Sequence, residues 1–193
     1  MLNYARRQQY RRLSRAGAAS IASAATITLA LAVARAGAEV AAGIVLLLAL
    51  SLGLYARHWL SLAERSAVGA RSEDEVKQAL APLEGDGWRL LHSLRWRGHG
   101  DIDSLAIAPS GVAFAIETKT RAYDDRHLAR VRAQARWLSR RRRRWCRRGA
   151  LPVLCVVRPR RVERVERQVL VVSIDRLTVA LRNAEGGVRR CAS

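Results

Sequence analysis

The stretch that decides the fold runs from Gly100 to Thr120 and reads G-D-I-D-S-L-A-I-A-P-S-G-V-A-F-A-I-E-T-K-T. Two short apolar runs flank a Pro-Ser-Gly turn, which predicts a β-hairpin. Side chains alternate between the faces of a strand, so Asp101 and Asp103 would share one face, and so would Glu117 and Lys119. The sequence therefore predicts that carboxylates and a lysine gather at one edge of a sheet.

The register of this hairpin follows from its turn. A three-residue turn places Asp103 opposite Glu117, whereas a shift by one residue would put the two carboxylates on opposite faces. The first register also sets a large side chain against a small one at the other paired positions, as a closely packed interior prefers. These pairs are Leu105 with Ala115, Ile107 with Ala113, Ala106 with Phe114 and Ala108 with Val112. Packing and chemistry thus favour the same register.

Two carboxylates and a lysine at one sheet edge are typical of a metal-dependent phosphodiesterase. We expect Asp103 and Glu117 to bind Mg²⁺ or Mn²⁺, with the Thr118 carbonyl as a further ligand, because hard cations prefer oxygen ligands. Lys119 would orient or deprotonate the attacking water, or stabilise the pentavalent phosphate. Lys77 and Lys119 are the only lysines among 35 lysine and arginine residues, which favours a chemical role for Lys119. The alternative is an exposed ion-pair cluster on a binding domain that does not cut.

The charge of the chain favours anionic partners. Its 193 residues carry a formal net charge of +19, which favours nucleic acid or an anionic membrane surface, although biased codon usage would also raise the arginine content. The densest basic run also contains two tryptophans; it would grip phosphate backbones while a tryptophan stacks on a base. A solvated helix end and attraction to anionic lipid headgroups are the alternatives. The arginines assigned to nucleic acid are Arg136, Arg140, Arg141, Arg143 and Arg144.

The N-terminal part has the pattern of a membrane anchor. A basic arm (1–15) precedes 19 uncharged residues (16–34), a short polar break (35–39) and 17 more uncharged residues (40–56). We interpret 16–56 as a transmembrane helical hairpin in contact with membrane lipid. Arginines before and after it place both ends in the cytoplasm, which predicts a multi-pass protein of the cell (inner) membrane with a cytoplasmic soluble domain. A cleaved signal peptide and a pair of buried soluble helices are the alternatives.

The rest of the chain is predicted to form a linker (57–67), a soluble domain (68–183) and a tail (184–193), which we expect to be frayed. Within the domain the pattern predicts a helix from a Ser72 capping box to about Leu80, three strands, a basic helix, two strands and a closing helix. The bounds outside the hairpin are 88–94, 127–144, 151–157, 169–173 and 174–183. This order predicts an α/β or α+β fold, a mixed sheet flanked by helices. The three cysteines lack C-x-x-C spacing, so neither a zinc site nor a disulfide framework is visible.

The same residues resemble a known family. The pattern G-x-x-S-E-x-x-V, which starts at Gly69, is followed by G-D-I-D, P-S-G-V-x-F-x-I-E-T-K and L-P-V-L-C-V-V. Together they resemble the nuclease-related domain (NERD) over residues 68–183. That family is similar in fold to the restriction-endonuclease superfamily of the PD-(D/E)xK type. The chain departs from it at Ser104, where a histidine is common, and at Thr120, where an asparagine is common.

The resemblance implies a catalytic set and a function. It implies DNA rather than RNA as the favoured partner, and a homodimer is consistent with it because many nucleases of this fold act as dimers. The prediction is a membrane-anchored, Mg²⁺-dependent nuclease at the cytoplasmic face; the alternative is a non-catalytic module that tethers nucleic acid to the membrane. The implied catalytic residues are Glu73 on the first helix, Asp103 on its strand, Glu117 and Lys119 of the acid-x-lysine triplet, and Gln134 on the following helix.

Overall fold

The structure is a computed structural model that describes residues 4–96 and 100–190. It divides into two compact units, Met1–Val68 and Gly69–Ser193. The ends of the predicted basic arm and tail, and residues 97–99 before the hairpin, lie outside the described residues.

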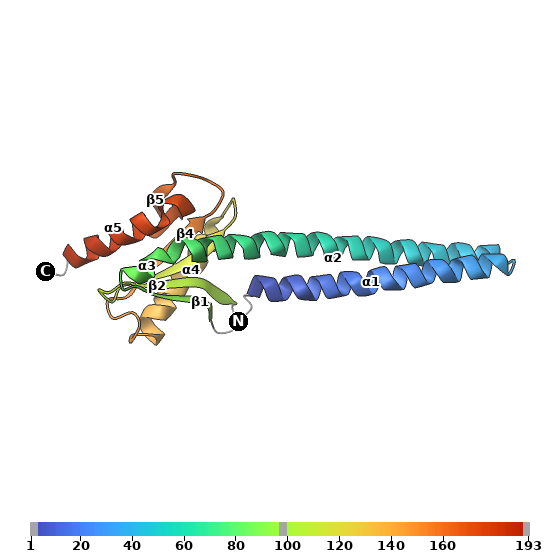
Figure 1. Ribbon diagram of the computed structural model, residues 1–193, viewed down its shortest axis with the longest axis horizontal. Coiled ribbons are helices and arrows are strands. Elements are labelled where there is room, and N and C mark those ends of the chain that lie inside the picture. The colour runs from blue at the N-terminus through green and yellow to red at the C-terminus, as the bar shows by residue number, and fades with distance from the viewer. Residues whose placement is uncertain (1–3, 97–99, 191–193) are drawn as a thin grey trace. The chain divides into compact units, whose positions relative to one another are not determined.

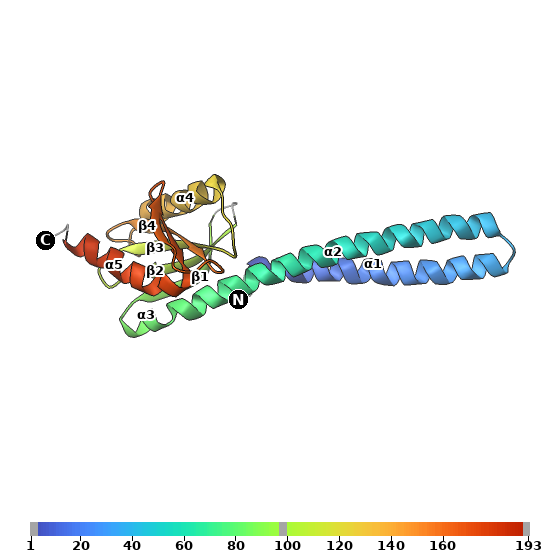
Figure 2. The same cartoon turned by 90° about the horizontal axis from the view of Figure 1, so that it is seen from above.

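The first unit is a pair of antiparallel helices, α1 (Tyr4–Arg35) and most of α2 (Glu39–Leu80), seen side by side in Figures 1 and 2. Between them Gly37 has a φ of 81°, in the left-handed region that glycine adopts without strain. Small buried residues let the helices approach closely. On α2 they recur every seven residues, the spacing that keeps one face toward a partner helix. They are Ala42, Ala49, Ala56 and Ala63 on α2, opposite Ala16, Ala19 and Ala30 on α1.

Polar contacts fix the two helices near their basic ends. The Arg12 guanidinium donates to the Leu62 carbonyl at 2.8 Å, and the Arg15 guanidinium lies 4.6 Å from the centre of the Trp59 ring. Further along, the Ser23 hydroxyl donates to the Ala49 carbonyl at 2.8 Å. These contacts define which faces of α1 and α2 meet.

The opposite faces of both helices are apolar and exposed. Both helices are long and apolar enough to cross a membrane by length and composition, and only 17% and 11% of their apolar windows are buried. The core helix of a soluble protein would instead be mostly buried. The large exposed apolar residues include Ile21, Ile27, Leu29, Leu31, Val40, Ile44, Leu46, Leu47, Leu48, Leu50 and Leu54.

The second unit is a six-stranded mixed sheet in the order β1-β2-β3-β4-β6-β5, which confirms the predicted fold class. β1 (Arg89–Arg95), β2 (Asp101–Ile107) and β3 (Ala113–Lys119) form an antiparallel meander. β4 (Ala150–Val156) lies parallel to β3, β6 (Val169–Ser173) lies parallel to β4, and β5 (Glu163–Glu166) closes the edge antiparallel to β6.

Helices cover both faces of the sheet, as Figures 1 and 2 show. The helix α4 (Asp125–Arg141) packs on one face through Ala135 and Leu138. The other face is covered by the last turns of α2, by the short α3 (Pro82–Gly85) and by α5 (Leu177–Arg190), which follows a 3₁₀ turn at Ile174–Arg176.

The predicted hairpin register is confirmed. Leu105 pairs with Ala115 and Ala106 pairs with Phe114, so each large side chain meets a small one. Leu105 and Ala115 lie in the cluster beneath α4, whereas Phe114 lies on the other face and stacks on Trp88 with ring centres 5.6 Å apart. The face that carries Glu117 is therefore the face covered by α4.

Substitutions at two glycines test this packing with opposite signs. Gly111 ends the hairpin turn with a φ of 86°, and a Cβ there would lie 3.1 Å from the Arg147 Cβ. Gly186 is helical, and a Cβ there would meet nothing within 4 Å. We expect Gly111→Ala to lower the free energy of unfolding by about 1–2 kcal/mol and Gly186→Ala to raise it by about 0.5–1 kcal/mol. Denaturation of the wild type and both variants in the same detergent measures these free energies. Changes in the same direction for both variants would contradict the packing described at one of the two glycines.

The structure corrects the prediction in four places. The predicted helix start at Ser72 is wrong, because α2 runs unbroken through it and residues 57–72 contain no proline and only Gly69 as a helix breaker. The Ser72 side chain is buried instead, with its hydroxyl 3.1 Å from that of Thr120. The basic helix ends at Arg141 rather than 144, and the arginines that follow lie in turns.

The other two corrections concern charged or glycine-rich segments. β5 was not predicted, because charged side chains suit an edge strand and hide its pattern. The turn after it places Arg167 and Gln168 at positive φ without the usual Asn-Gly signal. The closing helix continues to Arg190 despite two glycines, since Glu185 is buried and accepts a hydrogen bond from the Ser110 backbone at 3.3 Å.

Candidate active site

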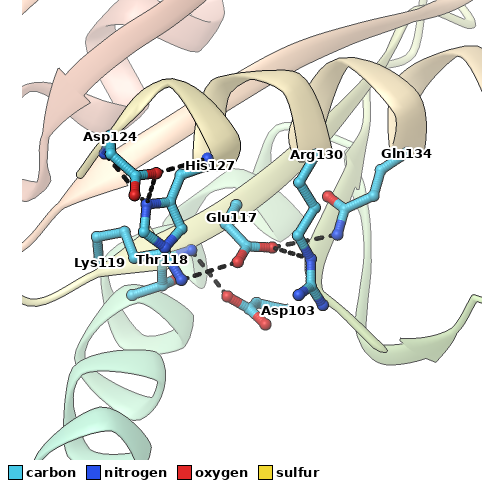
Figure 3. Close-up of polar contacts among 8 residues, drawn as sticks. All are labelled: Asp103, Glu117, Thr118, Lys119, Asp124, His127, Arg130 and Gln134. Carbon is cyan, nitrogen blue, oxygen red and sulfur yellow. Dashed lines mark hydrogen bonds and ion pairs between the residues drawn. The ribbon is translucent and has the colours of Figure 1, made fainter. Parts of the chain in front are cut away.

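The Glu117 carboxylate is the centre of the candidate site, near the end of β3. Its side chain is almost fully buried, with only 4% exposed. Oε1 accepts a hydrogen bond from Lys119 Nζ at 3.0 Å, and Oε2 accepts one from Gln134 Nε2 at 3.1 Å. The Arg130 Nε lies 3.8 Å from the same Oε2 (Figure 3). A buried carboxylate is thus held by three different nitrogen groups.

The Asp103 carboxylate lies beside it and takes the place of a backbone acceptor. Its Oδ2 accepts the Thr118 backbone N–H at 2.8 Å (Figure 3). The strand ladder is interrupted around Asp103: the pairing of β2 with β3 begins at Ser104, and on β1 the unpaired Ser93 has a φ of 55°. A local break of this kind changes the direction of a side chain. Here it directs the Asp103 carboxylate toward the end of β3.

The Asp103 carboxyl lies in a buried environment that also carries other negative charges. Burial raises the pKa of this carboxyl well above its usual range, and the charges of Glu117 and Glu73 raise it further. The Thr118 N–H and the Lys119 ammonium act in the opposite direction but do not compensate. Glu73, half-buried on α2, is therefore close enough to belong to the same electrostatic cluster.

The oxygen atoms at this site match those that a hard divalent cation prefers. Across the described residues no group of three or more His, Cys, Asp and Glu side chains could share a metal ion, so the side-chain ligands would be the two carboxylates. Gln134 Oε1 is buried and has no hydrogen-bond partner among the described residues. The side chains present therefore fit Mg²⁺ or Mn²⁺, with backbone or amide oxygens to complete the set.

The start of α4 positions the remaining side chains. Asp124 caps the helix: its carboxylate accepts the His127 N–H at 3.0 Å, and its own N–H donates to His127 Nδ1 at 3.1 Å. The hydrogen bond from the His127 backbone N–H lowers the pKa of the Asp124 carboxyl. From there, Arg130 and Gln134 lie four residues apart on one face of α4, directed at Glu117. Arg130 was missed in the sequence, although its spacing from Gln134 was the available signal.

The structure brings together the five residues that the resemblance implies. Lys119 and Gln134 each donate a hydrogen bond to Glu117, and the Asp103 carboxyl interacts by charge with both Glu117 and Glu73. Their catalytic roles remain predictions. Asp101 opens β2 opposite Arg95, two pairs beyond the interruption at Asp103.

The predicted nucleic-acid-binding arginines are all exposed on the second half of α4 and the turn after it. Trp137 and Trp145 instead pack against the apolar cluster beneath α4. The Arg142 guanidinium lies 4.9 Å from the centre of the Trp145 ring, and the Arg89 guanidinium lies 5.3 Å from it. The guanidinium groups are thus more exposed than the partly buried indole rings, and the stacking of a tryptophan on a base stays a prediction.

Comparison with known proteins gives a match to one family model. Residues 68–159 match the family model of the nuclease-related domain. No curated protein and no solved structure matches the chain. The matched stretch begins before the last turns of α2, includes both strands of the central hairpin and all of α4, and ends just beyond β4. Through this stretch the chain is similar to the nuclease-related domain family.

Proposed function

We propose that this chain is a membrane-anchored, metal-dependent nuclease that hydrolyses phosphodiester bonds of DNA. The observation that carries the proposal is the buried Glu117 carboxylate, held by Lys119 and Gln134 beside Asp103 within a nuclease-related domain. Burying a carboxylate costs free energy, so a cluster of this kind is a functional-site candidate.

Asp103 and Glu117 would hold the cation, with the Thr118 carbonyl as a further oxygen ligand. When bound, Mg²⁺ or Mn²⁺ would neutralise phosphate charge and lower the pKa of a bound water molecule. Gln134 Oε1, which has no hydrogen-bond partner among the described residues, offers an acceptor for a water proton at this site.

Lys119 and Arg130 would act on the water and the phosphate. The Lys119 side chain is 25% exposed, so its ammonium can contact both Glu117 and a substrate. It would orient the attacking water or stabilise the charge that develops on the phosphate. The Arg130 side chain is 41% exposed, and its guanidinium would contact a non-bridging phosphate oxygen.

The proposed anchor is the pair α1 and α2. Their exposed apolar faces suit a lipid environment, and Trp59 and Tyr55 lie at the end of the apolar segment, where aromatic rings favour the membrane interface. Arginines before residue 16 and at Arg57 favour a cytoplasmic position for both ends, in the cell's inner membrane.

A non-catalytic module that tethers nucleic acid to the membrane is the second candidate. One observation favours it: Lys119, Gln134 and Arg130 already balance the Glu117 carboxylate with groups of the chain itself. Such a network could persist as a structural ion-pair cluster.

The Lys119→Ala variant separates the two candidates. We expect the full chain in detergent to cleave mixed DNA substrates with Mg²⁺ and not with EDTA. Loss of the ammonium should lower the rate by about a hundredfold or more, since general acid–base groups contribute that much. Binding of Mn²⁺, followed by electron paramagnetic resonance, should persist in the variant. Absence of cleavage by the wild type, with salt-sensitive DNA binding by both proteins, would instead establish the tethering module.

A further inference from the structure

A groove of about 370 Å³ lies along the side of α4 that faces the start of β4. Three arginines four residues apart form one wall, because residues with this spacing lie above one another on a helix. The floor is apolar and the turn between β5 and β6 closes the rim. The arginines are Arg132, Arg136 and Arg140; the floor includes Leu151 and Pro152, and the rim includes Gln168.

This groove is separate from the candidate active site. Arg132 follows Arg130 by two residues, which turns it about 200° around the helix axis. Arg130 faces Glu117, so the arginine wall faces away from it. In the sheet, Ala150 at the groove pairs with Ala113, at the opposite end of β3 from Lys119. The two sites therefore lie on opposite sides of α4.

The groove carries positive charge without a counter-charge. No acidic residue lines it, and in the part of the chain that the structure describes none of its three arginines belongs to an ion pair. Arg132 Nε is buried and lacks a hydrogen-bond acceptor there as well. A buried donor left unsatisfied costs about 1–3 kcal/mol, so an acceptor added at this position would be stabilising.

We propose that this groove binds the sugar-phosphate backbone of a nucleic acid strand outside the catalytic cluster. Guanidinium groups match phosphate oxygens in pairs, and along α4 these three repeat about every 6 Å. The apolar floor, where Leu151 is 37% exposed, suits the sugars and bases of the same strand. The proposal rests on the proposed function only in taking nucleic acid as the substrate. The groove holds a strand away from the cleaved bond and reads no sequence.

Binding without hydrolysis tests the groove. We would measure the affinity of a fluorescent single-stranded oligonucleotide of mixed sequence for the full chain in zwitterionic nanodiscs, with EDTA and at several salt concentrations. The groove variant combines Arg132→Ala, Arg136→Ala and Arg140→Ala. The matched control combines three exposed arginines elsewhere on the domain, Arg160→Ala, Arg176→Ala and Arg182→Ala, and loses the same charge.

The groove variant should bind at least about tenfold more weakly than the control. Its slope of log K against log salt should be shallower by about 2, because each phosphate contact to a single strand contributes about 0.7. Near-ultraviolet circular dichroism checks that both variants are folded. Equal affinity and equal slope in the two variants would overturn the proposal. So would unchanged oligonucleotide binding with lost binding to phosphatidylglycerol vesicles, which would assign the arginines to lipid phosphate.

The same assay separates this proposal from the nuclease. In a Lys119→Ala background the groove variant and its control should differ in affinity by the same factor, because the groove lies at the opposite end of β3 from Lys119. A chain that binds through the groove and never cleaves would refute only the nuclease. If the chain cleaves DNA and the groove substitutions leave its affinity for the oligonucleotide unchanged, only the groove proposal is refuted.

Discussion

Replacing Glu117 by alanine is expected to abolish Mg²⁺-dependent DNA cleavage, by about a thousandfold or more. The substitution removes one of the two carboxylates that would hold the cation, a contribution of several kcal/mol to the barrier at about 1.4 kcal/mol per tenfold. Binding of Mn²⁺ should weaken in parallel. DNA affinity in EDTA should stay within about twofold of the wild type, because the exposed arginines of α4 and its following turn are untouched.

The control for this variant is Asp101→Ala. Asp101 is also an acidic residue of β2, but it opens the strand opposite Arg95, two residues before Asp103. Cleavage by Asp101→Ala should remain within a few-fold of the wild type. Equal cleavage by Glu117→Ala and the wild type would refute the assigned centre, whatever the metal. Equal loss in both variants would show a general effect of acidic substitutions on the hairpin.

Replacing Phe114 by alanine is expected to lower the free energy of unfolding of the second unit by about 3–5 kcal/mol. The side chain is fully buried, stacks on Trp88 and lies in the cluster that joins the sheet to α3 and α5. Its removal loses the transfer energy of the ring and leaves a cavity that a close-packed interior cannot fill. Near-ultraviolet circular dichroism of the full chain at increasing denaturant measures the loss.

Two further substitutions locate the source of that effect. Phe114→Leu keeps most of the volume and should cost less than half as much as Phe114→Ala. Val179→Ala, at a position 44% exposed on α5, should change stability by less than about 0.5 kcal/mol. A similar loss in Val179→Ala and Phe114→Ala would contradict the packing described for this face of the sheet.

The alternation of side chains along the hairpin was sufficient to predict much of the fold. The large-against-small pattern of Leu105 with Ala115 and Ala106 with Phe114 has one solution, because a slip by one residue exchanges the two faces. The same alternation placed Glu117 and Lys119 on one face. Long uncharged runs likewise predicted the two apolar helices, since such runs have few other structures available.

Other elements depended on residues distant in the sequence. Ser72 has the sequence of a helix cap, yet it lies inside α2 with its hydroxyl beside that of Thr120. β5 has charged side chains and forms by pairing with β6, and the end of α5 persists because Glu185 reaches the hairpin turn. Local patterns cannot predict these features, since their stability comes from partners that only the folded sheet supplies.

The candidate site also has features that the sequence predicts and features that only the tertiary structure shows. The sequence by itself determined the residue types at the end of β3, the partner strand and the basic character of the following helix. Only the tertiary structure decided that Arg130 and Gln134 face Glu117 while Arg132, Arg136 and Arg140 line a groove on the other side of α4. The physical reason is that a helix turns about 100° per residue, so where it packs on the sheet decides which arginines reach which side.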